Sequence, residues 1–288
     1  MYGAPPGRHA RVVILGLPFD HGSIYNPGCA QAPGVLRAIT RNEDLTAGFW
    51  RCDGGGASLP PLDVSDAGDL SYSPSRGAEA FFADIEEFVE NGLDQCQSCF
   101  GLGGDHTVTY PLVRAAAKVH RTLQILQLDA HDDCAPVAAY TRPTHSNFIA
   151  LLLAQPEVAR VIQIGVRGAS TGQVQPDPKR INTNIAGLPS ALLSGVPVYL
   201  TVDTDFFDPS IAPAVGHPTP NGARWNDLLA ILRLLQTGGH RLCAADWTEY
   251  NPTLEPPNCL TGRGVARGAL AVLAALQAVP LPADFESL

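Results

Sequence analysis

Short apolar runs alternate along the chain with longer segments that fit amphipathic helices. The runs, which predict β-strands, are Arg11–Leu17, Cys99–Leu102, Leu123–Leu128, Val161–Val166, Val196–Val202 and Arg241–Trp247. The longer segments, which predict helices, are Ala78–Gly92, Val108–Ala117, Asn147–Ala154, Trp225–Leu235 and Arg263–Ala278. This alternation is typical of βαβ units, so we predict an α/β fold with a mostly parallel central sheet covered by helices on both faces.

Two stretches rich in glycine and proline do not fit this alternation. Phe19–Gly34 is interpreted as a long ordered loop, and Ala169–Pro189 is left without an element. An α/β pattern resumes after each of them, so neither is interpreted as a domain linker. Because the chain also shows no internal repeat, we expect residues 1–288 to form a single catalytic domain.

Composition and charge narrow the class of partner. The chain has 45% hydrophobic and 16% charged residues, which is typical of a globular protein, and no apolar run is long enough to span a membrane. The net charge is −9 and no basic cluster occurs, which disfavours nucleic acid and anionic membranes and suits a cationic small molecule. Seven scattered cysteines disfavour a disulfide framework, so a reduced, cytoplasmic protein without a signal peptide is expected.

Acidic residues and histidines gather directly after four of the predicted strands. The groups are Asp105 and His106, then Asp129, His131, Asp132 and Asp133, then Asp203 and Asp205, and finally Glu249. In an open α/β sheet, ligands bind in the crevice beyond the carboxyl ends of the strands. The chain therefore directs titratable groups from several strands toward one place.

Spacing within the groups selects candidate ligands. In an extended chain, residues two apart point to the same side. The residues that share a side by this rule are Asp129, His131 and Asp133 in one segment, and Asp203 and Asp205 in another. Asp132 falls on the opposite side. The four carboxylates of the selected set would repel one another, and two divalent cations would balance their charge, so a binuclear metal site is predicted.

Each motif has a plainer explanation when taken alone. An Asp-x-Asp at a strand end is often a loop anchor, the glycines of Gly103-Gly104-Asp105-His106 fit a tight turn, and the Cys96–Cys99 pair enters a buried strand without a partner pair. The metal prediction depends on the motifs occurring together and in this order. One alternative is a binuclear phosphoesterase, which would need cationic groups to hold phosphate, and the site segments offer few of these. Another is a non-catalytic, metal-stabilised protein descended from an enzyme, which would be expected to have lost one or more of the ligands.

These residues carry a resemblance to the arginase/agmatinase (ureohydrolase) superfamily of binuclear manganese amidinohydrolases. The matching blocks are Gly-Gly-Asp-His at 103–106, Asp-Ala-His-Asp-Asp at 129–133, His145, Thr-Val-Asp-Thr-Asp-Phe-Phe-Asp-Pro at 201–209, and Glu249 before Asn251-Pro252. The opening Leu17-Pro18-Phe19-Asp20 resembles agmatinase-type N-termini. The resemblance implies an arginase-like three-layer α/β/α fold and assembly of the chain as a homo-oligomer, a trimer or hexamer.

The resemblance also implies a ligand set. His106 and Asp133 would bind one Mn²⁺, His131 and Asp205 the other, and Asp129 and Asp203 would bridge the two ions. This oxygen-rich set with one imidazole for each ion suits Mn²⁺, and Ni²⁺, Co²⁺ or Fe²⁺ would fit the same ligands.

The implied reaction is hydrolysis of a linear guanidino compound, agmatine-like, to urea and an amine. Asp133 resembles the family's proton carrier, His145 its proton shuttle or substrate-orienting imidazole, and Glu249 the carboxylate that pairs with the guanidinium. A hydroxyarginine, a guanidino acid or a formimino compound remains an alternative substrate.

The chain departs from the family pattern beside the substrate. Residues 213–218 read Pro-Ala-Val-Gly-His-Pro where relatives have Pro-Gly-Thr-Gly-Thr-Pro, so His217 is a candidate substrate-binding residue. Residues 134–143 lack the Asn and Ser side chains with which arginase holds an α-amino acid, and Arg142 in this stretch is a candidate for a substrate carboxylate. These departures leave the substrate and the roles of His217 and Arg142 open.

Overall fold

The computed structural model describes residues 1–23, 25–45, 48–50, 57–92, 97–136, 142–167 and 177–282. Its centre is an eight-stranded sheet in the order β4-β1-β5-β10-β9-β6-β7-β8, in which every neighbouring pair is parallel. The strands are β1 Val12–Leu17, β4 Val64–Asp69, β5 Ser98–Gly103, β6 Leu123–Leu128, β7 Val158–Ile164, β8 Arg180–Thr183, β9 Val198–Asp203 and β10 Leu242–Thr248. A separate two-stranded antiparallel sheet pairs β2 Phe49–Trp50 with β3 Ala57–Leu59.

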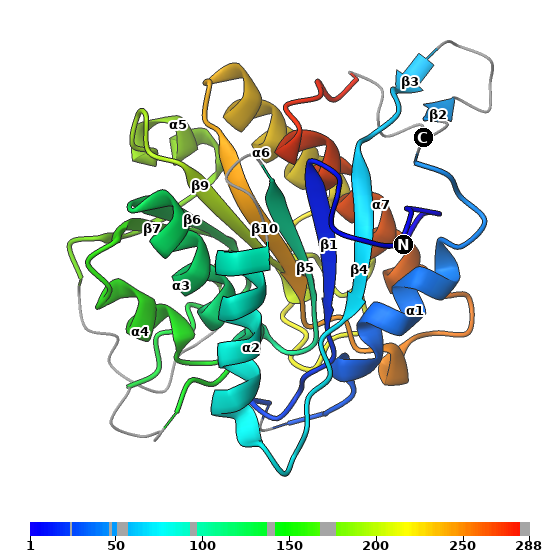
Figure 1. Cartoon of the computed structure of the whole chain (residues 1–288). Coiled ribbons are helices and arrows are strands. Elements are labelled where there is room, and N and C mark those ends of the chain that lie inside the picture. Colours follow the sequence, from blue (N-terminus) through cyan, green and yellow to red (C-terminus); the bar gives the residue numbers. More distant parts are fainter. Residues whose placement is uncertain are drawn as a thin grey trace.

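Helices cover both faces of the central sheet, which confirms the predicted three-layer α/β/α fold (Figure 1). One face packs on α2 Gly77–Gly92, α3 Thr109–His120 and α4 Phe148–Leu153. The other packs on α1 Ala32–Ile39, α5 Leu188–Ala191, α6 Trp225–Thr237 and α7 Leu260–Leu276. Alternate residues of β1 enter the two cores, with Val12 and Ile14 on one side and Val13 and Leu15 on the other. This is why the apolar runs are almost continuous.

The elements that the sequence pattern did not predict lie mostly at the margins. Strands β4 and β8 are the two edges of the sheet, where a strand has one neighbour and need not be apolar, so their polar sequences hid them. The interpretation of Phe19–Gly34 as loop was wrong at its end, because a 3₁₀ helix, η1 Cys29–Gln31, leads into α1 at Ala32. Pro33 sits in the first turn of α1, where proline is tolerated. In the stretch 169–189, residues 169–176 lie outside the described residues.

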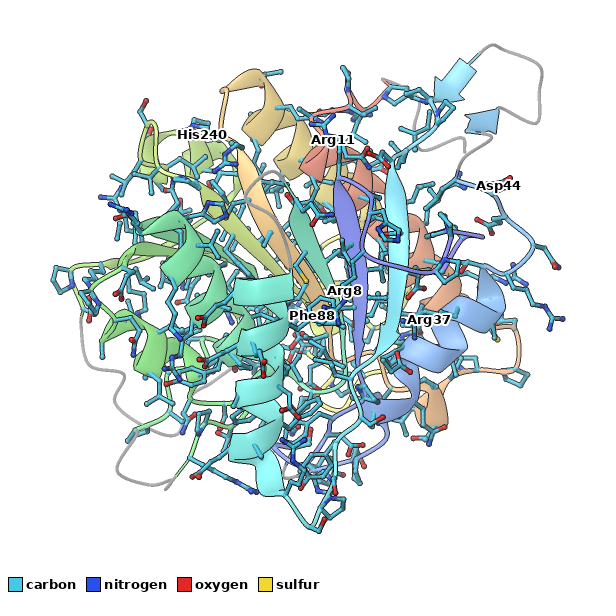
Figure 2. The ribbon with its side chains drawn as sticks, in the orientation of Figure 1. Arg8, Arg11, Arg37, Asp44, Phe88 and His240 are labelled. Atoms are coloured by element: carbon cyan, nitrogen blue, oxygen red, sulfur yellow. The ribbon has the colours of Figure 1, made fainter. Side chains whose placement is uncertain are left out.

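The segment before β1 pairs with the edge strand β4 at Pro6 and contacts helix α2 at Arg8. The Arg8 guanidinium carbon lies 4.0 Å from the centroid of the Phe88 ring on α2 (Figure 2). None of the helices in the part of the chain that the structure describes has both the length and the apolarity to cross a membrane.

Candidate metal centre and active site

The four strands at the middle of the sheet are β5, β10, β9 and β6, and each is followed at its carboxyl end by candidate site residues. These strands come from distant parts of the chain. They are neighbours because the strand order reverses in the middle of the sheet. Open α/β sheets bind ligands at such a reversal, beyond the carboxyl ends of the strands. We call His106, Asp129, His131, Asp133, Asp203 and Asp205 the central cluster; the structure brings all six together.

Three carboxylates of the central cluster surround one buried imidazole nitrogen. His106 Nδ1 lies 3.2 Å from Asp129 Oδ2, 3.3 Å from Asp133 Oδ2 and 3.1 Å from Asp203 Oδ2. His131 lies at the other end, with Nδ1 2.9 Å from Asp205 Oδ2 and 3.7 Å from Asp129 Oδ1. Asp129 therefore lies between the two histidines.

The hydrogen bonds of His106 fix its tautomer. Its Nε2 lies 2.8 Å from Thr201 Oγ1, and the Thr201 hydroxyl in turn donates to Asp246 Oδ1 at 2.6 Å. Because that hydroxyl proton is used on Asp246, His106 Nε2 must donate to Thr201. Nδ1 then faces the carboxylates and is left for a metal ion or a proton, and among the described residues no hydrogen-bond donor reaches it although it is buried. This arrangement is typical of a histidine that binds a metal ion through one nitrogen and is oriented through the other.

Two overlapping donor groups could hold cations. One consists of His106, Asp129 and Asp203, the other of Asp129, His131 and Asp205, and within each the ligand atoms lie within 4.8 Å of one another. Asp129 belongs to both groups, as expected of a bridging ligand. Oxygen-rich sets with an imidazole suit Mn²⁺ and similar divalent ions, so the residues present fit a pair of such cations.

The electrostatics of the central cluster are unbalanced without cations. Burial and the nearby Asp205 raise the pKa of Asp203 well above its usual value, and burial and Asp129 do the same for Asp133. Although burial lowers the pKa of His131, its carboxylate partners Asp129 and Asp205 raise it to about 12. Within the described residues, the four aspartates have no ion-pair partners other than the imidazoles of His106 and His131.

The local backbone differs from the extended chain that the spacing argument assumed. Asp133 lies in a loop with φ 46°, in the left-handed region, and Asp205 belongs to the 3₁₀ helix η5 Thr204–Phe206. The side chains nevertheless converge, because backbone amides hold the carboxylates in tight turns. His131 N donates to Asp129 Oδ1 at 2.6 Å, and Asp205 N donates to Asp203 Oδ1 at 2.8 Å.

Glu249 and His145 lie beside the central cluster. Glu249 Oε1 accepts a hydrogen bond of 2.8 Å from the His106 backbone N and lies 3.7 Å from His145 Nδ1. Burial and the charge of Asp105 raise the pKa of Glu249 to about 8, and burial together with His217 lowers that of His145 to about 4. Among the described residues, none makes a hydrogen bond to the buried His145 Nε2. A buried carboxylate without a cation is the kind of group that a guanidinium would satisfy.

The remaining candidates lie farther out. The His217 ring centroid is 5.5 Å from that of His145, 6.1 Å from that of His131 and 5.6 Å from that of the exposed Tyr25. Arg142 is turned to the backbone, donating to His21 O at 3.1 Å. Most of the stretch between Asp133 and Arg142, residues 137–141, lies outside the described residues, as does Cys96 of the Cys96–Cys99 pair.

Several residues at the site were not selected from the sequence. Cys29 Sγ lies 3.5 Å from Glu249 Oε2, Asp105 Oδ2 accepts from Gly22 N at 2.7 Å, and Gln127 Nε2 donates to Asp129 Oδ2 at 2.7 Å. Asp105 had a signal in the sequence, because it lies in the Gly-Gly-Asp-His motif. Gln127 had one too, because a polar residue in a strand buried on both faces needs a polar partner, whereas Cys29 had none.

The chain is similar to proteins of known function in both sequence and structure. The Arginase family model matches residues 10–275. Proclavaminate amidinohydrolase of Streptomyces clavuligerus is 31% identical over 80% of this chain and 77% of its own length, and a human mitochondrial guanidino acid hydrolase is 28% identical over 96% of this chain and 80% of its own. The solved structure of the Streptomyces enzyme superposes with a TM-score of 0.81, at 24% identity, over 96% of each chain. The chain belongs to the Arginase family.

Proposed function

We propose that this protein hydrolyses a linear guanidino compound, agmatine-like, to urea and an amine, using two Mn²⁺ ions. The observation that carries the proposal is the pair of overlapping donor groups that share Asp129, with the buried Glu249 carboxylate beside them. A cationic, planar substrate group and two divalent ions are the charges that such a site lacks.

The enzyme class does not depend on the choice of substrate. The relatives are named amidinohydrolase, guanidino acid hydrolase, agmatinase and arginase, which are all hydrolases of C–N bonds in linear amidines. The predicted class of hydrolase is therefore confirmed, whereas agmatine itself stays a proposal.

Within the proposal, the central cluster holds the cations. His106 and Asp133 would bind one ion, His131 and Asp205 the other, and Asp129 and Asp203 both. When bound, such a pair of ions lowers the pKa of water and polarises a C=N group. Mn²⁺ is proposed over Ni²⁺, Co²⁺ or Fe²⁺ because most of the donors are carboxylate oxygens.

The protein's own side chains would orient the substrate and move the protons. Glu249 would hold the guanidinium in its plane, and Asp133 would take the proton of the attacking water and deliver it to the leaving nitrogen. Burial favours the neutral form of His145, so its imidazole can accept or relay a proton at the pocket.

A guanidino acid, a hydroxyarginine or a formimino compound is the second candidate. It is favoured by His217, whose ring reaches within 5.5 Å of the His145 ring, because an imidazole there can bind a carboxylate or a hydroxyl of the substrate. Both candidates are small molecules, and neither involves nucleic acid or a membrane.

The test is a substrate panel with the Mn²⁺-loaded protein. Agmatine, arginine, hydroxyarginine, guanidino acids and formiminoglutamate are supplied in turn, and urea is measured separately from formamide. Urea release that is highest with agmatine supports the first candidate. Formamide release, or preference for an acid, replaces it with the second, and no turnover of any compound contradicts the proposal.

Three further expectations belong to this proposal. A single catalytic domain over 1–288 is supported by one sheet whose strands run from Val12 to Thr248. A homo-oligomer, trimer or hexamer, is expected from the family resemblance. A reduced, cytoplasmic setting is supported by the free thiols of the described residues Cys29, Cys99, Cys134, Cys243 and Cys259.

A further inference from the structure

A buried glutamine holds two carboxylates of the central cluster. Gln127, on β6, is fully buried, and its Nε2 donates to Asp129 Oδ2 at 2.7 Å and to Asp133 Oδ2 at 3.0 Å. Ionised carboxylates only accept hydrogen bonds, so both N–H groups of this amide are used on them. The amide oxygen of Gln127 must then face the other way.

A second glutamine completes the arrangement from the next strand. Gln163 on β7 lies opposite Gln127 in the strand register and is 1% exposed. Its Nε2 donates to Gln127 Oε1 at 2.7 Å and to the backbone oxygen of Asp132 at 2.8 Å. Gln163 Oε1 has no hydrogen-bond partner within the described part of the chain, but the reverse orientation of this amide would set oxygen against oxygen at both contacts. The two amides therefore have one consistent direction, toward the carboxylates.

The glutamines hold the loop that carries Asp133. The backbone of Asp133 has φ 46°. This conformation is unfavourable for a residue with a side chain and persists only when the surrounding structure imposes it. Gln127 holds the Asp133 carboxylate, Gln163 holds the Asp132 carbonyl, and Arg180 on β8 lies 3.4 Å from Asp132 Oδ2. Three adjacent strands thus fix one turn.

The chemistry of the donors suits a site that receives cations. An arginine or lysine in the place of Gln127 would satisfy the same carboxylate oxygens but would also neutralise them and repel a divalent ion. A neutral amide orients the carboxylates and leaves their full negative charge to the ion.

We propose that Gln127 and Gln163 are positioning residues that set the affinity of the central cluster for divalent cations. The inference rests on the proposed cation site and goes beyond it by assigning part of the affinity to an amide pair that binds neither cation nor substrate.

The test compares two glutamines of the same strand. Gln124 is as buried as Gln127, but it lies at the opposite end of β6 and donates to Leu193 O at 2.9 Å and Val196 O at 2.8 Å. Gln127→Met and Gln124→Met each replace a buried amide by an apolar chain of similar length. Mn²⁺ affinity is measured by competition with a chelator, the visible spectrum is recorded with bound Co²⁺, and unfolding is followed by circular dichroism.

We expect Gln127→Met to bind Mn²⁺ about 10- to 100-fold more weakly than the wild type. Its Co²⁺ spectrum should change, because the carboxylates are reoriented. Gln124→Met should keep the Mn²⁺ affinity and the Co²⁺ spectrum of the wild type, even if it is destabilised as much as Gln127→Met. Unchanged Mn²⁺ affinity in Gln127→Met, or an equal loss in Gln124→Met, would overturn the inference.

A second variant covers the case in which Gln127→Met does not fold. Gln163→Met keeps the Gln127 amide on the carboxylates and removes only the hydrogen bond from Gln163 that orients this amide. We therefore expect a smaller loss of Mn²⁺ affinity, about threefold to tenfold. If Gln163 acts through Gln127, the double variant loses less than the product of the two single losses. Independent, multiplicative losses would contradict that coupling.

The outcomes separate this inference from the proposed function. A wild type that retains fewer than two cations per chain overturns the proposed cation site itself. A wild type that retains two, together with a Gln127→Met variant that retains them equally well, overturns the role of the amide pair alone.

Discussion

Two groups of aspartates in this protein differ in whether the chain itself supplies their counter-charge. At the edge of the sheet, Asp66 and Asp69 of β4 face Arg37 of α1, whose Nε and Nη2 donate to the two oxygens of Asp66 at 2.8 and 2.9 Å (Figure 2). We call these three residues the edge cluster. In the central cluster, the only ion-pair partners of the four carboxylates among the described residues are the imidazoles of His106 and His131.

The pKa values follow this difference. Burial raises the pKa of Asp66, but the hydrogen bonds from Arg37, together with the nearby Met1 amino group, outweigh it and hold the value at about 2. In the central cluster, burial and neighbouring carboxylates raise the pKa of Asp133 and Asp203 instead. The edge cluster is complete as the chain folds, whereas the central cluster requires charge from outside. A shortage of internal counter-charge is therefore a better sign of a binding site than the number of acidic residues.

The largest expected effect comes from removing the shared carboxylate of the central cluster. Asp129→Asn should lower kcat/KM by about 10³-fold or more and reduce cation retention, because both donor groups lose a charged ligand. Urea assays and elemental analysis measure this. Asp208→Asn is the control, since Asp208 only caps a loop by accepting from Ser210 N and Gly222 N. Full turnover by Asp129→Asn would contradict a role for Asp129 in both cation groups.

The next effect should separate substrate binding from cation binding. Glu249→Gln should keep both cations but lower kcat/KM by about 100-fold, because the amide has lost the charge that pairs with a guanidinium. The matched control is Glu255→Gln, because Glu255 accepts from the backbone of Thr261 and Gly262 at the start of α7. Steady-state kinetics at saturating Mn²⁺ decide the outcome, and equal kinetics in the two variants would remove Glu249 from the site.

A third prediction concerns the edge cluster and pH. Because the folded pKa of Asp66 lies below its unfolded value, its ion pair stabilises the fold above about pH 4, and this contribution is lost as pH falls toward 2. Asp66→Asn should cost about 2 kcal/mol in the free energy of unfolding at pH 7. Urea denaturation at several pH values measures it.

Two comparisons sharpen the test of Asp66. The difference between Asp66→Asn and wild type should shrink below pH 4, and the cation content should stay at the wild-type level. Asp69→Asn, in the same edge cluster, should cost less because its side chain is 39% exposed and solvent already screens it. A constant difference across pH would exclude the ion pair as its cause.

The smallest expected effect is at the rim of the pocket. His217→Ala should raise KM about tenfold with little change in kcat if His217 contacts the bound substrate. His240→Ala is the control, because His240 precedes the amino end of the central strand β10, whereas the site lies at the carboxyl ends of the strands (Figure 2). A change in KM with an acidic substrate alone would identify the carboxylate as the group that His217 binds.

The interior of the fold was more predictable than its margins. All six predicted strands and all five predicted helices appear in the structure with ends shifted by up to three residues. Burial on both faces makes most positions of the central strands apolar, and the helices bury one face, so both kinds of element leave a pattern in the sequence. The edge strands β4 and β8 have no such demand, and α1 was hidden behind a segment rich in glycine and proline.

The candidate site shows the same division. Its acidic residues and histidines could be selected because they follow buried strands in a recognisable order. Their partners could not, since Gln163, Thr201 and Asp246 reach the site only through strand pairing across the sheet. Asp133 does lie with Asp129 and His131, as their spacing predicts, but the turn that brings it to the site has φ 46°, which an extended chain does not provide.

The sequence by itself determined which side chains follow the central strands, because the alternation of apolar runs and helical segments dictates a parallel sheet and each chemical motif is contiguous in the chain. The tertiary structure alone decided which carboxylates receive a counter-charge and which do not. Arg37 reaches Asp66 across the boundary between α1 and β4, while the middle of the sheet brings four strands together without any arginine or lysine paired to the central cluster in the described residues. Charge balance depends on distances between residues far apart in the chain, and only folding sets those distances.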